Sequence, residues 1–306
     1  MRYFCRRPLL FWFLLLLMVG GMLVFSVVVF STASGQPPAA SAPHAPRPAT
    51  SKTATTPAVP FHATWGSTYY YGGIPKPTPS FADTLIVLTN TGYVAGFDEN
   101  KKEPAWVCYR LFAANNHQAP PRPQGFNIDR RTYARVAQSD YARSGYDRGH
   151  LAPNHAIALC YGPAAQLETF LMSNIIPQRP NLNRKIWERL ERLELDHYAA
   201  AFGQVWVIVG PTFSKARLPR GVAVPSACFK ILVVDHAGTP QVLALLIPQN
   251  VEGAESPDQF ITSIDAVERA TGLDFLPDLP KELQDRLEGR KAESMWAKTA
   301  TPPSQI

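Results

Sequence analysis

A charge-free apolar run at residues 8–30 constrains this chain more than any other feature of its sequence. Arg2, Arg6 and Arg7 precede the run. With a rise of about 1.5 Å per residue, a helix over this run crosses a bilayer core of roughly 30 Å. Arginines that flank a membrane span tend to stay in the cytoplasm, and the rest of the chain then crosses. We therefore predict a basic cytoplasmic segment at residues 1–7 and a transmembrane anchor at residues 8–31.

The run is longer than the apolar core of a usual signal peptide, which favours an anchor that stays uncleaved. Small residues near Gly35 leave cleavage there, followed by secretion, as the alternative. Residues 32–60 are rich in Pro, Ala, Ser and Thr without an apolar period, so we expect an extended linker. We predict a folded domain at residues 61–296, outside the cytoplasm, and a flexible tail at residues 297–306.

The charge of the chain is uneven. The formal net charge is +6, but residues 61–306 hold 25 basic and 24 acidic side chains, so a basic field over the whole domain is absent. Residues 110–192 hold 12 Lys and Arg against 6 Asp and Glu, a surplus that suits a polyanionic ligand.

Four cysteines bear on the redox chemistry. Cys5 lies on the cytoplasmic side of the apolar run, which leaves Cys108, Cys160 and Cys228 and at most one disulfide. No CxxC pair occurs, which argues against a zinc ribbon or a thioredoxin-like site. Cys108 and Cys228 lie in apolar runs, which predicts that they are small buried hydrophobic residues.

Short apolar runs separated by turn residues predict antiparallel strands. We expect strands at residues 84–88, 93–97, 105–109, 205–209, 229–234 and 242–247, and a further strand within residues 129–141. Apolar residues at helical spacing predict a helix over residues 182–202, and shorter helices are expected at 166–172, 256–272 and 281–293. Because no βαβ rhythm is present, the order predicts an α+β domain with a mainly antiparallel sheet packed by helices.

Two polar stretches carry the chemistry. Residues 147–153 read Asp-Arg-Gly-His-Leu-Ala-Pro, with a glycine that lets the backbone turn between Arg148 and His150. The second stretch supplies Asn174, Asn183 and Glu191. Histidine, arginine and oxygen ligands without cysteine are typical of phosphodiester hydrolysis assisted by a hard metal ion.

Each residue of the two stretches can be given a role. A neutral His150 can take the proton of the attacking water near pH 7, and Arg148 can bind the scissile phosphate. Asn183 is the candidate direct ligand of Mg²⁺, with Mn²⁺ or another divalent ion as an alternative. Glu191 lies about 12 Å further along an ideal helix, which favours contact with the metal through water. Asn174 can orient His150 or its loop.

These residues resemble the DNA/RNA non-specific endonuclease family, which includes mitochondrial endonuclease G and secreted bacterial nucleases. The resemblance rests on four blocks in order and at matching gaps, with weaker similarity across about residues 71–280. The blocks are residues 147–153, residues 173–178, Leu182-Asn183, and Trp187 with Leu190-Glu191.

The resemblance implies a ββα-metal (His-Me finger) core, with the histidine on a hairpin element and the asparagine on a crossing helix. By motif position, His150 matches the general base, Asn183 the Mg²⁺ ligand and Glu191 the acid that holds metal-bound water. Arg148 matches the arginine at the phosphate and Asn174 the supporting asparagine. The family also suggests a homodimer.

Two further positions come from the resemblance. Arg135 is similar to an additional substrate-binding arginine. Leu195 is a departure, because family members often carry an arginine four residues after the glutamate. Arg192 or Arg189 could compensate for it.

Other readings of the same residues stay open. Taken singly, Asn183 is a typical helix N-cap, Glu191 an ordinary solvated acid, and Asp147 an acceptor that stabilises its loop. His155, His197 and His236 are expected to be structural, and Trp187 and Trp206 to lie in the core. HExxH and GxSxG motifs are absent, which disfavours a metallopeptidase or a serine hydrolase. The two remaining hypotheses are a membrane-tethered, metal-dependent endonuclease that cuts DNA and RNA, and a non-catalytic module that captures nucleic acid.

Overall fold

The computed structural model describes residues 65–79, 85–113 and 119–297. Its centre is a seven-stranded antiparallel sheet with the order β10-β9-β8-β7-β4-β3-β2. The strands are β2 (Leu85–Thr89), β3 (Tyr93–Asp98), β4 (Glu103–Phe112), β7 (Gln204–Arg217), β8 (Ala223–His236), β9 (Thr239–Pro248) and β10 (Ile261–Thr262). Two short ladders lie beside it: β1 (Lys76–Pro77) with β11 (Leu273–Asp274), and β5 (Asp147–His150) with β6 (Ile175–Gln178).

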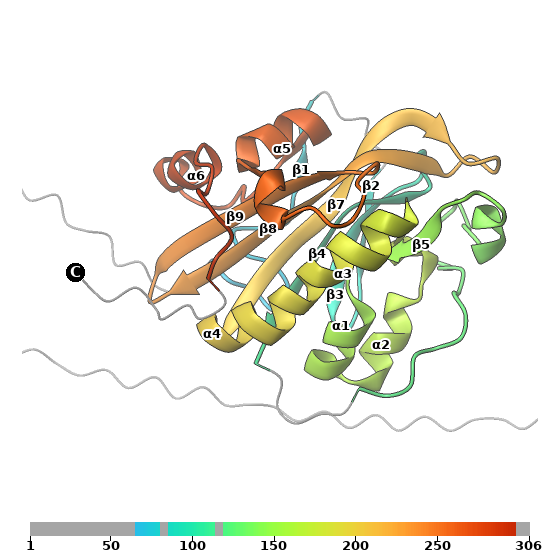
Figure 1. Cartoon of the computed structure of the whole chain (residues 1–306), viewed down its shortest axis with the longest axis horizontal. Helices are drawn as coiled ribbons and strands as arrows, with labels where there is room; N and C mark the ends of the chain where they lie inside the picture. The colour runs from blue at the N-terminus through green and yellow to red at the C-terminus, as the bar shows by residue number, and fades with distance from the viewer. Residues whose placement is uncertain (1–64, 80–84, 114–118, 298–306) are drawn as a thin grey trace, which may run out of the picture. The chain divides into compact units, whose positions relative to one another are not determined.

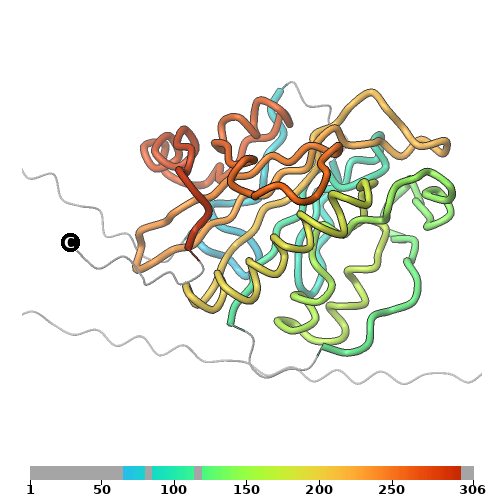
Figure 2. Tube along the Cα trace, in the orientation of Figure 1, coloured from blue at the N-terminus to red at the C-terminus, as the bar shows by residue number. Residues whose placement is uncertain are grey.

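Strands β4 and β7 are neighbours in the sheet although about ninety residues separate them along the chain. Their ladder pairs Val107 with Val209 and Phe112 with Gln204. The intervening stretch holds β5, β6 and most of the helices, and Figure 2 shows it as the green-to-yellow part of the trace. The stretch contains η1 (Gln138–Tyr141), α1 (Asn154–Tyr161), α2 (Pro163–Thr169), η2 (Met172–Asn174), η3 (Leu182–Trp187), α3 (Glu188–Arg192), η4 (Leu193–Ala199) and α4 (Ala200–Phe202).

Alternate residues of the central strands feed two hydrophobic cores on opposite faces of the sheet, as the two-residue period of a strand requires. Tyr109 and Val207 face the first core with Ile157 of α1 and Trp187 of η3. Cys108 faces the second core, which is covered by α5 (Ile264–Thr271) and α6 (Lys281–Glu288). The short helix η5 (Pro257–Phe260) comes before α5 in the chain. In Figure 1, α5 and α6 lie apart from α1 to α4.

One helical segment runs without a break from Leu182 to Phe202, as the sequence predicted. Its hydrogen bonding alternates, because η3 and η4 are π-helical and α3 between them is α-helical. A π turn closes its hydrogen bond over five residues instead of four, so it carries an extra residue per turn. This change of register could not be seen in the spacing of the apolar residues.

Most predicted strands are present, and β4, β7, β8 and β9 are longer than expected. The prediction of a strand within residues 129–141 was wrong, because no strand lies there. Arg135 there has a left-handed backbone with φ +48°, and Asp140 closes a turn onto the amide of Ala137 at 3.0 Å. The helix predicted at 256–272 is interrupted by β10 and restarts at Ser263, whose hydroxyl accepts from the Ala266 amide. Helix α1 was not predicted.

The anchor predicted at residues 8–31 and the linker at 32–60 lie outside the described residues, as do His62, His117 and all but the first residue of the predicted tail. Within the described ranges, no helix is both long and apolar enough to cross a bilayer. Cys108 and Cys228 are buried free thiols, as predicted, and Cys160 is a half-buried free thiol.

Candidate active site

The short β5–β6 ladder fixes the backbone of His150. Gly149 pairs with Ile176 and His150 with Ile175. A Cβ at position 149 would collide with the side chain of Gln178, so glycine is needed for a close approach. The sequence had suggested that this glycine allows a turn, but Gly149 lies in an extended strand.

His150 is buried, with 8% of its surface exposed. Its ring packs against those of Phe126 and Phe170, with centroids 5.5 and 4.9 Å away, and these two rings are themselves 5.3 Å apart. Burial, with a smaller contribution from the charge of Arg122, lowers the pKa of His150 to about 3. Among the described residues, its buried Nε2 atom has no hydrogen-bond partner. The imidazole is therefore neutral at pH 7 with a nitrogen left to accept a proton.

Asn174 holds the loop that follows His150. It is fully buried, and its Oδ1 accepts from the Ala152 amide at 2.8 Å. Its Nδ2 donates to the carbonyls of Ala152 at 3.0 Å and Thr169 at 2.9 Å. The side-chain amide of Asn174 is thus fully hydrogen-bonded to backbone groups. Asn174 therefore acts on His150 through the loop that it holds.

Asp147 orients Asn183. The Nδ2 atom of Asn183 donates to Asp147 at 3.0 Å, so its side-chain carbonyl is the group left for a ligand. Arg184 donates two further hydrogen bonds to the same carboxylate, at 2.8 and 2.6 Å. These donors hold the pKa of Asp147 below its ordinary value although burial opposes them. Asp147 is therefore an acceptor, as the sequence indicated, but it lies in β5 and holds Asn183 and Arg184 of the helical segment instead of its own loop.

His150, Asn183 and Glu191 meet at one depression of about 320 Å³. Asn183 and Glu188 are five residues apart, the span of one π turn, and Glu191 follows on the adjoining α turn. The register of the helix thus brings the side chains of Asn183, Glu188 and Glu191 to the depression. The depression is lined by Arg122, Arg148, His150, Asn154, His155, Asn183, Arg184, Glu188 and Glu191.

A buried ionic network lies beneath Glu191. Lys230 of β8 is fully buried, bonds Glu194 at 2.7 Å, and lies over the Trp187 ring at 4.4 Å. The indole of Trp187 donates to the His150 carbonyl at 3.2 Å. Burial raises the pKa of Glu191 to about 8, while the charge of Lys230 opposes this shift. Lys230 therefore supports both the histidine strand and the helix that carries Glu191.

Two arginines frame His150 through its aromatic neighbours. Arg148 lies over the Phe126 ring at 5.3 Å, and Arg122 lies over the Phe170 ring at 5.1 Å. Both line the depression. Arg135 is exposed and does not line it.

Leu195 is buried in the first core beside the depression. The arginines that could compensate for it are already engaged. Arg189 donates to the Glu255 carbonyl at 2.6 Å, and Arg192 pairs with Glu188 at 2.8 Å. Two cations of this depression were not identified from the sequence: Arg122, and Arg184, which is paired with Asp147.

Sequence reasoning missed five residues of the depression: Arg122, Asn154, His155, Arg184 and Glu188. Arg122 lies outside the predicted strands, helices and motifs, and its position between Pro121 and Pro123 was the one signal of a stiffened backbone. Glu188 was hidden because its approach depends on the π turn. His155, expected to be structural, is exposed at the rim.

Comparisons with known proteins identify the family of the chain. A family model described as DNA/RNA non-specific endonuclease matches residues 74–282. A nuclease of Nostoc sp. is 30% identical over 230 residues, which cover 70% of this chain and 81% of that protein. Human mitochondrial endonuclease G is 31% identical over 215 residues, covering 61% of this chain and 68% of that protein.

A solved structure also matches the fold. It is the EndoG/EndoGI complex, described as the mechanism of EndoG inhibition, at 26% identity and a TM-score of 0.59. The match covers 67% of this chain and 91% of that one. The protein is thus a nuclease, a hydrolase by class. It belongs to the DNA/RNA non-specific endonuclease family.

Proposed function

We propose that this protein hydrolyses phosphodiester bonds in DNA and RNA through a ββα-metal site, with His150 as general base and Asn183 as the direct ligand of Mg²⁺. One observation carries the proposal: a neutral histidine with an unpartnered nitrogen lines the same depression as Asn183 and Glu191. The β5–β6 ladder supplies the two strands of this arrangement and η3 supplies its helix.

The donor set fits a hard divalent ion. Asn183 offers a carbonyl oxygen that Asp147 holds in place, and Glu191 and Glu188 offer carboxylates at the same depression. Oxygen donors few in number, with room for waters, suit Mg²⁺, and Mn²⁺ would be accepted as well. When bound, the ion stabilises negative charge on the leaving oxygen. We assign direct contact to Asn183 and contact through water to Glu191.

The protein's own residues perform the remaining steps. His150 is neutral at pH 7, so its Nε2 atom can remove a proton from the attacking water. Its ring is held by Phe126 and Phe170, and its loop by Asn174. Arg148 and Arg122, which line the same depression, bind the phosphate, and Arg122 takes the place of the cation absent at Leu195. Arg135 contacts the substrate further along its backbone.

We further propose that residues 8–31 anchor the nuclease in a membrane with its domain on the extracytoplasmic side, with secretion after cleavage near Gly35 as the alternative. The basic residues before the apolar run support this orientation. The family supports a homodimer. Membrane fractionation and sizing of the full chain test both statements, and a chain that stays in the cytoplasm contradicts the first.

The first prediction concerns His150→Ala in the full chain, purified in detergent and tested on plasmid DNA and RNA. The wild type should cut both with Mg²⁺ and neither with chelator. Loss of a general base should lower the cleavage rate by about 10²–10⁴-fold. His236→Ala, at the exposed end of β8, is the matched control and should cut at the wild-type rate. Binding of intact DNA without cleavage under any divalent metal would instead support the nucleic-acid capture module.

A further inference from the structure

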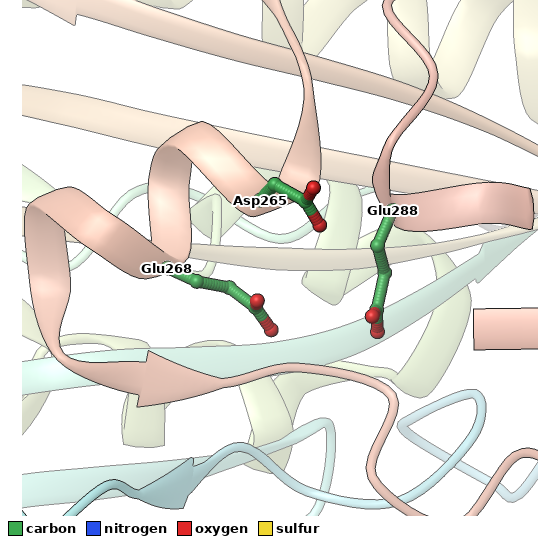
Figure 3. Close-up of side chains that lie close together, drawn as sticks. All are labelled: Asp265, Glu268 and Glu288. Atoms are coloured by element: carbon green, nitrogen blue, oxygen red, sulfur yellow. The ribbon is translucent and has the colours of Figure 1, made fainter. Parts of the chain in front are cut away.

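A second group of acidic residues lies on the other face of the sheet, between α5 and α6. Asp265 and Glu268 come from α5, and Glu288 is the last residue of α6. One carboxylate oxygen from each side chain lies within 4.8 Å of the other two. Figure 3 shows that the carboxyl ends of the three side chains turn toward the same space. None of the three is fully exposed, so this is not a solvated surface patch.

Among the described residues, the carboxylate of Glu288 is not fully hydrogen-bonded. Its side chain is buried, with 5% of the residue exposed. Within the part of the chain that the structure describes, its Oε1 atom has no hydrogen-bond partner. Glu268, by contrast, accepts from the Phe275 amide at 2.8 Å and so is fixed in position. A buried carboxylate oxygen without a partner is costly unless something that is not protein occupies the space.

The charge around these residues is strongly negative. Burial, and then the charges of Glu268 and Asp274, raise the pKa of Glu288 to about 8. Burial also raises the pKa of Glu268. The cation that opposes both shifts is Lys281, and its ammonium pairs with Asp285 at 2.6 Å on the exposed side of α6. The negative charge of the three carboxyls is therefore offset only in part by Lys281.

We propose that Asp265, Glu268 and Glu288 bind a hard divalent cation of the Ca²⁺ class, which joins α5 to α6. Ca²⁺ binds oxygens at about 2.3–2.6 Å, so ligands on its opposite sides lie up to about 5 Å apart. Mg²⁺ keeps several of its waters and is usually bound through only one or two carboxylates. Each of the three oxygens lies within 4.8 Å of the other two, a separation that a Ca²⁺ ion can bridge. Three carboxylates also supply the charge that Ca²⁺ sites use.

This site is independent of the nuclease centre. Helices α5 and α6 pack into the second core, on the face of the sheet opposite η3 and α3. The proposal uses no residue of the depression around His150, so it can fail while the nuclease function stands. The expected effect is on stability, because the ion ties α5 to α6 and Glu268 also holds the backbone that follows β11.

The second prediction is a thermal unfolding experiment on the full chain, stripped of metal, in an Asn183→Ala background that removes the proposed ligand of the nuclease centre. Ca²⁺ at a hundredfold excess over its Kd should raise the Tm by roughly 5–10 °C. Glu288→Gln should abolish this rise. Asp265→Asn provides an independent second variant. Glu282→Gln, an exposed acid on the same helix, is the matched control and should keep the rise.

Equilibrium dialysis with Ca²⁺ gives a second readout that does not depend on unfolding. The Asn183→Ala chain should bind one ion, and the Glu288→Gln and Asp265→Asn variants of it should bind none. The proposal would be overturned if Ca²⁺ neither raised the Tm of the Asn183→Ala chain nor bound to it in dialysis. So would a rise that persists in both variants, or a larger rise with Mg²⁺ than with Ca²⁺.

Discussion

His150 illustrates how burial sets the state of a single side chain. An unperturbed histidine is about half protonated near pH 6.5, which would make it a poor base in weak acid. Here the two phenylalanine rings remove the imidazole from water, and the charge of Arg122 disfavours a second positive charge beside it. The histidine is thereby held in its neutral form before any substrate arrives, and it is a weaker base than a free histidine. Keeping it neutral costs stability at low pH.

The third prediction follows from this cost. The unfolded histidine titrates near pH 6.5 and the folded one near 3, so between these values the unfolded chain binds the extra proton. The free energy of unfolding should therefore fall on acidification below about pH 6.5, by up to about 1.4 kcal/mol per pH unit from this residue. Urea unfolding in chelator between pH 4.5 and 7 measures it. His150→Gln should flatten the slope, whereas His236→Gln should not, and equal slopes in all three chains would refute the account.

At this scale the sequence identified residues better than their roles. The ordered motifs pointed to His150, Asn183 and Glu191, and these three meet at one depression. Arg122 could not be found, because its approach depends on the Phe170 ring, which comes from a distant part of the chain. The reason for Gly149 was also different from the one expected, since only the structure shows how close Gln178 comes.

The helical segment from Leu182 to Phe202 is the element that decides the geometry of the site. Its position was predictable from the apolar stripe of Ile186, Leu190 and Leu193. Its π turns were not, because they depend on packing against the rest of the molecule. Lys230 is one such contact: it lies below Trp187 and beside Glu194, and so touches both η3 and η4. A buried lysine on a central strand could not be assigned a partner from sequence.

The fourth prediction tests this contact. Lys230→Met leaves the Glu194 carboxylate buried without its counter-ion, which should lower the free energy of unfolding by about 3–5 kcal/mol. The double variant Lys230→Met, Glu194→Gln should recover more than half of the loss. Lys76→Met is the matched control, because its pair with Asp278 is more than half exposed and should contribute no more than about 1 kcal/mol. Urea unfolding measures all four chains. If Lys230→Met were as stable as Lys76→Met, Lys230 would not be the counter-ion that stabilises buried Glu194.

At the scale of the molecule, one sheet separates two tasks. Its first face carries the nuclease depression, and its second face carries α5, α6 and the three acids. The α+β class with a mainly antiparallel sheet was predictable from the spacing of apolar runs and turns. The order of the strands was not, because the pairing of β4 with β7 joins residues about ninety positions apart and no local pattern encodes it.

The fifth prediction concerns the separation of the two faces. Leu287 is buried in the second core, so Leu287→Ala should lower the free energy of unfolding by about 2–5 kcal/mol. Below its Tm, the folded variant should cut DNA at the wild-type rate. Leu190→Ala, in the first core beneath the depression, should lose a similar amount of stability and also cut more slowly. Equal loss of activity in the two variants would show that the faces are coupled.

The register of β4 and β7 has a consequence for how such a protein can be altered. Phe112 and Gln204 are paired neighbours, so the chain leaves the sheet and returns to it at almost the same point. Every residue assigned to the depression lies between those two positions. The catalytic apparatus is therefore a cassette inserted into a β-hairpin. Replacing it with a short turn would expose the first face of the sheet, so another cassette would have to cover the same apolar residues.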